Sequence, residues 1–226
     1  MREKTVYTLG LIGSLILLYN LFTVFMVLPD EAMQGAIYRI LFIHVPAAFA
    51  AWILYTVALV GSVMFLVKKD FAYDSMATSC IEVATMFTLV NLVTGSIWGR
   101  VMWGIWWAWD VRLTSQLICF LLYLGYLLLR PAVNEPTQRA TMSAILSIFA
   151  FVDIPIVFMA IRWHDARTQH PAPVLETGGL APEFKGPFWL GVLSFILISG
   201  AMVLVRLHQE NTRREMDSVR REVHAL

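Results

Sequence analysis

Six long apolar runs constrain the fold of this chain more than any other feature of its sequence. They cover residues 7–28, 40–67, 76–98, 114–129, 141–161 and 187–207, of which the second is long and the fourth short. A helix needs about 20 mostly apolar residues to cross a membrane. A soluble helical protein would alternate polar and apolar faces along such stretches, whereas these runs are apolar on all sides. The sequence therefore predicts an all-α membrane protein, a bundle of six transmembrane helices.

The composition supports a membrane protein and gives no sign of a nucleic-acid partner. Hydrophobic residues make up 58% of the chain and charged residues 15%, against about 25% charged in soluble domains. The formal net charge of +1 leaves no broad basic surface. Arg2 and Lys4 precede the first run as in a signal peptide, but the run is long and no cleavage site follows it. We therefore expect the first run to be a retained helix surrounded by membrane lipid.

The lysines and arginines of the loops predict the orientation, because positive charge gathers on the cytoplasmic side. Eleven lie on the side of the two termini, and they are Arg2, Lys4, Lys68, Lys69, Arg130, Arg139, Arg206, Arg213, Arg214, Arg220 and Arg221. Six lie on the other side, and they are Arg39, Arg100, Arg112, Arg162, Arg167 and Lys185. We expect both termini in the cytoplasm.

The runs divide the chain into a membrane domain at 1–207 and a cytoplasmic tail at 208–226. The tail carries both signs of charge and could continue the last helix, but we expect a solvated segment without a special role. On the outer side, the loop at 162–186 is rich in Pro and Gly and should be irregular, and long loops are often functional. Cys80 and Cys119 fall in different spans, near opposite ends, so we expect no disulfide between them. No C-x-x-C-H motif is present, which excludes a c-type cytochrome.

The segment 98–115, WGRVMWGIWWAWDVRLTS, holds five of the eight tryptophans within twelve residues. Trp gathers at membrane interfaces, which explains single residues but not this density. The five indoles offer about 1,000 Å² of surface, more than the largest apolar patch of a typical soluble monomer. We expect a short interfacial helix. The spacing of its tryptophans does not decide between a belt that faces lipid and a surface that binds a ligand or a partner. The five are Trp98, Trp103, Trp106, Trp107 and Trp109.

Three histidines share the predicted outer side with this segment. His44 lies near the outer end of the second run, and His164 and His170 lie in the last outer loop. A lone His near a helix end is usually a hydrogen-bonded structural residue, and a loop His is usually solvated. Two His with an aromatic surface between them, however, suit a large flat cofactor held through iron, such as haem. Arg100, Arg112 and Arg167 could pair with its propionates.

Two acidic residues interrupt the apolar runs. Glu82 lies in the third run and Asp153 in the fifth, in FVDIPIVF. A carboxylate at the bilayer centre costs on the order of 2.5–3.5 kcal/mol, so each should face the bundle interior. Pro155 leaves a carbonyl without its donor one turn earlier, and Asp153 could order a helix kinked there. We favour structural roles over a proton relay.

Several of these segments resemble a known family. Residues 98–130 resemble the tryptophan-rich signature of the haem-handling membrane proteins of cytochrome c biogenesis, known as the WWD motif. The continuation WDVRLTS, the chain length, the six spans and the segments FIHVPAA and DIPIVF are similar to the CcmC family of cytochrome c maturation. The resemblance covers residues 35–205.

The resemblance implies a function at the outer face of a bacterial inner membrane. Such proteins bind haem b between two axial His and against the tryptophan motif. They present it to a periplasmic haem chaperone, CcmE, and work with the small subunit CcmD and the exporter pair CcmA and CcmB. We expect haem to contact the five tryptophans, Arg100 and Arg112, and the chaperone to dock on Trp106, Trp107, Trp109 and Asp110. The chain need not make or break bonds in haem, so we expect it not to be an enzyme.

The resemblance matches His44 to the first axial ligand and leaves two candidates for the second. His164 follows Trp163 at a helix end and lies beside Asp165, which could raise its pKa or orient it as a ligand. His170 precedes Pro171, which favours an extended backbone, and its segment is the more similar to the ligand segment of the family. We therefore expect His44 and His170 to bind the iron.

Two other functions remain as alternatives. The main one is a subunit of a membrane haem exporter or transporter, for which polar groups along a midplane path or broken helices in repeated halves are typical. Glu82 and Asp153 are the only acids within the runs, and no repeat is present. A quinone-linked oxidoreductase with two haems would need His pairs near both faces, whereas His44 alone lies in a run.

Overall fold

The computed structural model describes residues 2–162, 170 and 179–224. In these residues it is built of helices, with one isolated bridge between Glu31 and Gly35 and no strand. The predicted all-α fold is therefore confirmed. The helices are α1 (Arg2–Phe22), α2 (Leu41–Lys68), α3 (Phe71–Trp103), α4 (Val111–Ala132), α5 (Pro136–Phe151), α6 (Asp153–Met159) and α7 (Pro182–His224), with a π-helical turn at Thr23–Val27 and a 3-10 turn at Ala36–Ile40.

In the described part of the chain, six helical stretches are long and apolar enough to cross a membrane. They are Glu3–Val27, Ala36–Lys68, Phe71–Trp103, Val111–Ala132, Pro136–Met159 and Pro182–Arg220. Each overlaps one of the predicted runs, so the prediction of six spans is confirmed. The third and the last stretches extend well beyond their runs. Both helices continue into polar residues, whereas the predicted runs end where the apolar residues end.

The fifth span is broken into α5 and α6 at Val152, as Pro155 suggests. Proline has no N–H to donate to the carbonyl of residue 151, so the regular ladder stops there. The N–H of Val152 instead reaches the carbonyl of Phe149 at 3.2 Å. Asp153 is 8% exposed, and one of its carboxylate oxygens has no hydrogen-bond partner in the described residues. Its predicted position in the bundle interior is confirmed, and its role stays open.

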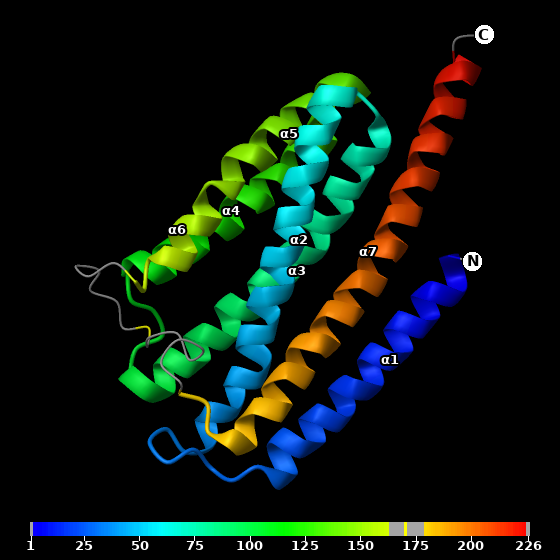
Figure 1. Cartoon of the computed structure of the whole chain (residues 1–226). Coiled ribbons are helices and arrows are strands. Elements are labelled where there is room, and N and C mark those ends of the chain that lie inside the picture. Colours follow the sequence, from blue (N-terminus) through cyan, green and yellow to red (C-terminus); the bar gives the residue numbers. More distant parts are fainter. Residues whose placement is uncertain (1, 163–169, 171–178, 225–226) are drawn as a thin grey trace.

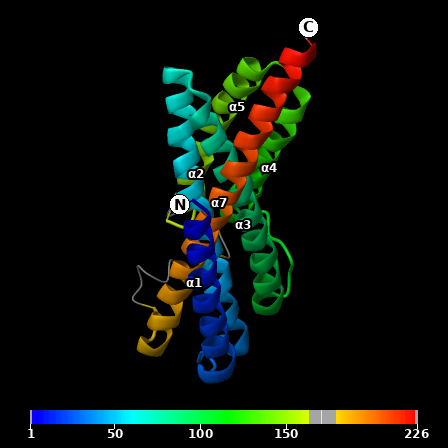
Figure 2. The ribbon, with the colours of Figure 1, turned by 90° about the vertical axis from the view of Figure 1, so that its right-hand side faces the viewer.

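The helices form two groups on either side of α2 and α3, which pack along each other's length (Figure 1). On one side α4, α5 and α6 complete a helical cluster, and on the other α1 and α7 lie side by side (Figures 1 and 2). Close packing of α1 on α7 depends on Gly13, where a Cβ atom would come within 2.9 Å of the Ile198 side chain. Small residues allow such close approach between membrane helices.

Both chain termini point to the same end of the bundle (Figure 1). Here α1 begins and α7 ends, whereas α3 ends and α4 begins at the opposite end, which carries the tryptophan-rich segment. We call these the termini end and the tryptophan end. Their separation agrees with the predicted alternation of the spans.

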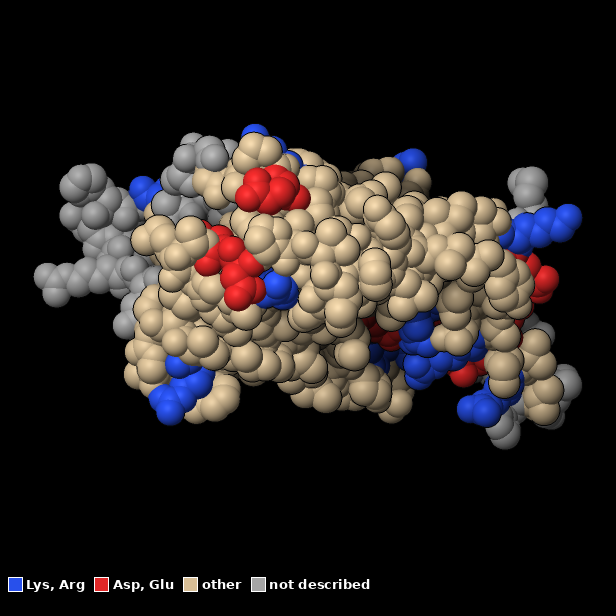
Figure 3. Space-filling model, turned by 90° about the horizontal axis from the view of Figure 1, so that it is seen from below, with Lys and Arg blue, Asp and Glu red and all other residues tan. Residues whose placement is uncertain are grey.

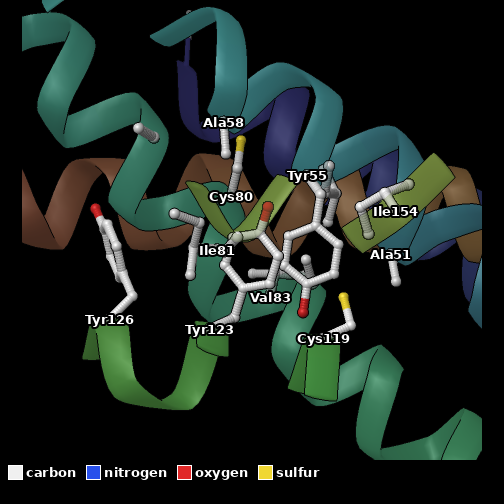
Figure 4. Packing of buried hydrophobic residues seen from close by; sticks show 14 of the residues in the cluster. Ala51, Tyr55, Ala58, Cys80, Ile81, Val83, Cys119, Tyr123, Tyr126 and Ile154 are labelled. Atoms are coloured by element: carbon white, nitrogen blue, oxygen red, sulfur yellow. The ribbon is translucent and has the colours of Figure 1, made fainter. Parts of the chain in front are cut away.

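The main core lies between α2, α3 and α4 around two stacked tyrosines (Figure 4). The rings of Tyr55 and Tyr123 are 3.8 Å apart between centroids and nearly parallel, at 12°. Tyr55 Oη lies 3.0 Å from the hydroxyl of Thr88, which satisfies its polar end. Cys80 and Cys119 are buried in the same core as free thiols, which confirms that they form no disulfide.

The segment after residue 207 continues the last helix, and its first turns take part in a buried ion network, which a fully solvated tail would not do; beyond Arg214 its described residues are half-buried or exposed. It continues α7 to His224, and Glu210 is 7% exposed. Arg130 holds both carboxylate oxygens of Asp74, at 2.9 and 3.0 Å, and reaches Glu210 at 3.3 Å. Arg214 pairs with the same two acids. These ion pairs tie α7 to α3 and α4 and explain why the helix does not end at the membrane surface.

Candidate functional site

A cavity of about 320 Å³ opens at the tryptophan end between α2, α3, α4 and their connections. It collects residues from five separate parts of the chain, including the loop before α2 and residue 170. Most of the lining is apolar or aromatic, with a few polar groups. The lining residues are Met33, Gln34, His44, Asn91, Leu92, Gly95, Ser96, Trp98, Gly99, Met102, Trp103, Ile105, Trp106, Trp107, Ala108, Arg112, Leu113, Gln116 and His170.

The tryptophan-rich segment is not an interfacial helix, so that prediction is wrong. α3 runs on through Trp103 and ends at Gly104, which adopts a left-handed conformation (φ 76°) that favours glycine. Residues 105–110 form an irregular connection. α4 then starts at Val111, and Asp110 caps it by accepting a hydrogen bond from the N–H of Leu113 at 2.8 Å.

Four of the five tryptophans line the cavity, and they differ in exposure. Trp103 and Trp106 are exposed at 39% and 60%, while Trp107 is half-buried. The indole N–H of Trp107 is buried and has no hydrogen-bond partner in the described residues. Trp109 is 78% exposed, packs edge-on against Trp107 and lies outside the lining. The cluster therefore presents an inner wall to the cavity and one indole to the surroundings.

Trp98 is fixed by the loop that precedes α2. Its indole N–H donates to the side-chain oxygen of Gln34 at 2.8 Å. The carboxylate of Glu31 accepts hydrogen bonds from the backbone N–H groups of Met33 and Gln34, at 3.0 and 2.7 Å, which folds this turn. Arg39 closes the loop by donating to the carbonyls of Val24 and Leu28, each at 2.9 Å. The loop therefore holds one rim of the cavity.

The two described arginines predicted for the site have different positions. Arg112 lines the cavity, donates to the carbonyl of Val157 on α6 and lies 5.7 Å from the ring centroid of Trp52. Arg100 lies outside the lining, where it donates to the carbonyl of Gly104 and stacks over Trp106 at 5.9 Å. Arg112 is therefore available to a ligand, whereas Arg100 fixes the shape of the connection.

His44 lies in the first turn of α2, and α3 contacts its ring on several sides. Its Nδ1 atom lies 3.0 Å from the hydroxyl oxygen of Thr94, and Trp98 approaches edge-on at 5.8 Å. At Gly95 a Cβ atom would lie 3.0 Å from Cε1 of the imidazole, so the absence of a side chain makes room for the ring. His44 is thus hydrogen-bonded, as the structural interpretation expects, and it also lines the cavity.

The hydrogen bonds of Thr94 indicate which nitrogen of His44 carries the proton. The Thr94 hydroxyl has carbonyl acceptors at Val90 (2.7 Å) and Asn91 (3.1 Å), so its own proton is used there. Its oxygen then accepts from Nδ1–H, which leaves a lone pair on Nε2.

Asn91 does not block that lone pair. The amide nitrogen of Asn91 lies 3.2 Å from Nε2 and 3.4 Å from Nδ1 of His44. Both ring nitrogens flank Cε1, and an atom this close to both would clash with Cε1 if it lay in the ring plane, so it lies over the ring face. The same amide donates to the backbone carbonyl of His44 at 3.0 Å. The in-plane lone pair of Nε2 is therefore not used by Asn91, and His44 lines the cavity.

His170, the preferred second ligand, lines the same cavity and lies within electrostatic reach of His44. His164 and Arg167 lie outside the described residues. The structure therefore brings together His44, His170, Trp98, Trp103, Trp106, Trp107 and Arg112 at one cavity. It leaves Arg100, Trp109 and Asp110 beside it.

The sequence analysis missed the residues of α3 that hold His44. Asn91, Thr94, Gly95 and Trp98 recur with the spacing i, i+3, i+4 and i+7, which places them on one helix face. Polar and small residues on one face of an otherwise apolar span are the signal that could have identified them. Gln34 had no comparable signal, because its contact with Trp98 depends on how the loop folds.

Comparison with known proteins identifies the family of the chain. The family described as heme exporter protein C (CcmC) matches residues 1–222. The chain belongs to the CcmC family. Relatives named heme exporter protein C include those of Bradyrhizobium diazoefficiens, 36% identical over 84% of this chain and 73% of the relative, and Escherichia coli K12, 31% identical over 79% and 72%. A ccmC-like mitochondrial protein of cytochrome c biosynthesis from Marchantia polymorpha is 32% identical over 81% of this chain and 78% of its own length.

Membership of the CcmC family confirms the resemblance of the tryptophan-rich segment. The matched region includes every element that lines the cavity, from the loop before α2 to the start of α4.

Proposed function

We propose that this chain binds haem b in the cavity at the tryptophan end and delivers it to a periplasmic haem chaperone, CcmE, for the maturation of c-type cytochromes. The observation that carries the proposal is the state of His44. Its Nδ1 is held by Thr94, which leaves the in-plane lone pair of Nε2 for iron, and it lines an aromatic cavity together with His170. A histidine whose second nitrogen is hydrogen-bonded has the tautomer and orientation of a metal ligand.

The donors of the cavity fit haem as the cargo. Neutral imidazole is a common axial ligand, and the indole and aliphatic lining suits the porphyrin faces. The unpartnered indole N–H of Trp107 and the guanidinium of Arg112 offer hydrogen bonds to propionates. The names of the relatives, which contain heme exporter and cytochrome c biosynthesis, support the same cargo and pathway.

Delivery requires binding that is firm but reversible. In this proposal the chain orients haem and changes no bond within it, so it is not an enzyme. The cavity is built at the end of the bundle, and Trp106 and Trp109 are largely exposed beside it. A chaperone that docks on Trp106, Trp107, Trp109 and Asp110 would meet the haem directly. If docking of the chaperone removes contacts between haem and these indoles, the barrier to haem release falls.

We further propose that the tryptophan end faces the periplasm and that both termini lie in the cytoplasm of a bacterial cell. The excess of Lys and Arg at the termini end supports this orientation. A reporter fused after residue 226 should be active only in the cytoplasm, and one inserted near residue 177 only outside it. Activity of both fusions on the same side would contradict the orientation.

The delivery proposal is tested by purifying the chain in detergent and measuring its haem and its transfer. We expect one haem per chain with a low-spin bis-His absorption spectrum, and loss of that haem on addition of apo-CcmE. Turnover of quinol by the haem-loaded protein would favour an oxidoreductase instead. Retention of haem in the presence of apo-CcmE would contradict delivery.

The alternative of a haem exporter subunit is favoured by the name of the family, heme exporter protein C. In that case the chain would act within a complex with CcmA, CcmB and CcmD and would move haem only during ATP hydrolysis. Haem loading of the purified chain without CcmA and CcmB separates the two functions. Loading of the isolated chain supports delivery, and loading that needs ATP hydrolysis supports export.

A further inference from the structure

A second cleft, of about 250 Å³, opens at the termini end between α3, α4, α5 and α7. Figure 3 shows cationic and anionic side chains gathered in a hollow near this end. Four arginines line the cleft: Arg130 from α4, Arg139 from α5, and Arg213 and Arg214 from α7. Helix-borne arginines that converge on one cleft within a membrane protein need counter-charges.

Two of these arginines are neutralised within the protein. Arg130 and Arg214 share the carboxylates of Asp74 and Glu210, and Asp74 is only 2% exposed. Glu82, which also lines the cleft, pairs with Arg206. The acids of the network are therefore matched one to one by arginines, and none is left for the other two.

Arg139 and Arg213 are the arginines that remain. Among the described residues neither guanidinium has an ion pair or a side-chain hydrogen bond. Arg139 lies within electrostatic reach of Arg130, Arg213 and Arg214. Of the acids near it, Glu210 is already shared by two other arginines, and the exposed Glu135 caps the start of α5. The Nε of Arg214 is buried without a partner. The cleft therefore has unused hydrogen-bond donors and crowded positive charge.

The position and charge of the cleft define the class of ligand. Arg130 lies in the last turn of α4 and Arg139 in the first turn of α5, so both lie where a span meets the headgroup layer. Leu127 and Pro131 supply an apolar wall. Asp217 is the remaining acid of the lining. Asp217 offsets one of the two positive charges of Arg139 and Arg213, so the lining keeps one net positive charge beyond the ion network. One positive charge matches a singly charged phosphodiester better than a doubly charged phosphate.

We propose that this cleft binds the phosphodiester of an anionic phospholipid, such as phosphatidylglycerol, through Arg139 and Arg213. The planar guanidinium fork matches phosphate oxygens, and basic pockets between membrane helices bind lipid headgroups in this way. The bound lipid bridges α5 and α7, the two elements that supply these arginines. The site is separate from the haem cavity, which lies at the other end of the bundle.

The test is native mass spectrometry of the detergent-purified full chain titrated with phosphatidylglycerol or phosphatidylcholine. We expect preferential retention of phosphatidylglycerol by the wild type. Each guanidinium near a headgroup contributes about fivefold, so the Arg139→Gln, Arg213→Gln double variant should bind phosphatidylglycerol about 25-fold more weakly. Lys4→Gln removes the same charge at the same end but outside the cleft, and it should bind as the wild type does.

Two further measurements make the outcome decisive. Inorganic phosphate and glycerophosphoglycerol are added as soluble probes, and displacement of the lipid by the diester alone supports a phosphodiester site. Equal lipid binding by the wild type and the double variant would overturn the proposal, as would a loss equally large in Lys4→Gln. The double variant should keep the haem spectrum of the wild type, so failure here is distinguishable from failure of the haem proposal.

Discussion

The buried acids of the termini end and the polar groups that line the cavity at the tryptophan end are bonded in opposite ways. At the termini end, Asp74 and Glu210 are each shared by Arg130 and Arg214, so the bonds of both acids are satisfied. At the tryptophan end, Thr94 bonds only the Nδ1 atom of His44, the Asn91 amide lies over the ring face, and the indole N–H of Trp107 has no partner in the described residues. Buried polar groups whose hydrogen bonds and ion pairs are all made fix helices to one another. Polar groups in a cavity that lack such a partner are available to a ligand.

The largest effect is expected at the satisfied end, from Asp74→Ala. This change leaves Arg130 and Arg214 buried without their shared acid, and breaking a buried pair costs about 3–5 kcal/mol. Thermal unfolding in detergent is followed by the reaction of a thiol dye with Cys80 and Cys119, which are buried in the folded protein. The exposed Glu215→Ala should change stability by about 0.5 kcal/mol at most. Equal midpoints for the two variants would show that the ion network does not stabilise the fold.

A large effect on the cargo without an effect on the fold is expected from Thr94→Val. Valine keeps the shape of threonine but removes the oxygen that accepts from Nδ1–H of His44. Loss of such a partner typically weakens metal binding 10- to 100-fold. Haem titration of the purified variant measures the change, and Thr94→Ser should restore most of the affinity. Wild-type affinity in Thr94→Val would mean that this hydroxyl does not set the tautomer.

A smaller effect is expected from Gly95→Ala, which adds a methyl group 3.0 Å from Cε1 of His44. The imidazole must turn away from its present rotamer, at a cost of about 1 kcal/mol or fivefold in haem affinity. Gly125→Ala is the matched control, because no atom lies within 4 Å of its Cβ position. If both alanine variants bind haem alike, α3 does not shape the pocket around His44.

The smallest change in haem affinity is expected from Trp109→Ala. Its indole is 78% exposed and lies outside the lining of the cavity, so affinity should stay within about twofold of the wild type. Transfer of haem to apo-CcmE, followed by absorption spectroscopy, should nevertheless slow. Transfer at the wild-type rate would remove Trp109 from the docking surface.

Sequence reasoning identified the parts of this protein that depend on local pattern. The six spans followed from continuous apolar runs, and the break of the fifth span followed from Pro155. The interfacial helix was wrong because Gly104 ends α3 in a left-handed turn that the periodicity of Trp103, Trp106 and Trp107 does not reveal. The spacing of side chains predicts a shared helix face only where the backbone is helical over the whole segment.

The remaining features depend on contacts between distant segments. Asp74 and Arg130 are 56 residues apart, and Asp74 and Arg214 are 140 apart, so their network has no local signal. The same holds for His44 and Thr94, which are 50 residues apart. The charges of residues 208–226 were read as solvated because their partners on α3 and α4 could not be known before the helices were placed.

The central claim is that the free Nε2 edge of His44 binds the haem iron. The most direct measurement is the absorption spectrum of purified His44→Gly protein with and without added imidazole. The account predicts loss of the low-spin bis-His spectrum in the variant and its return with imidazole, which occupies the space left by the side chain. A wild-type spectrum in His44→Gly without imidazole would contradict the claim.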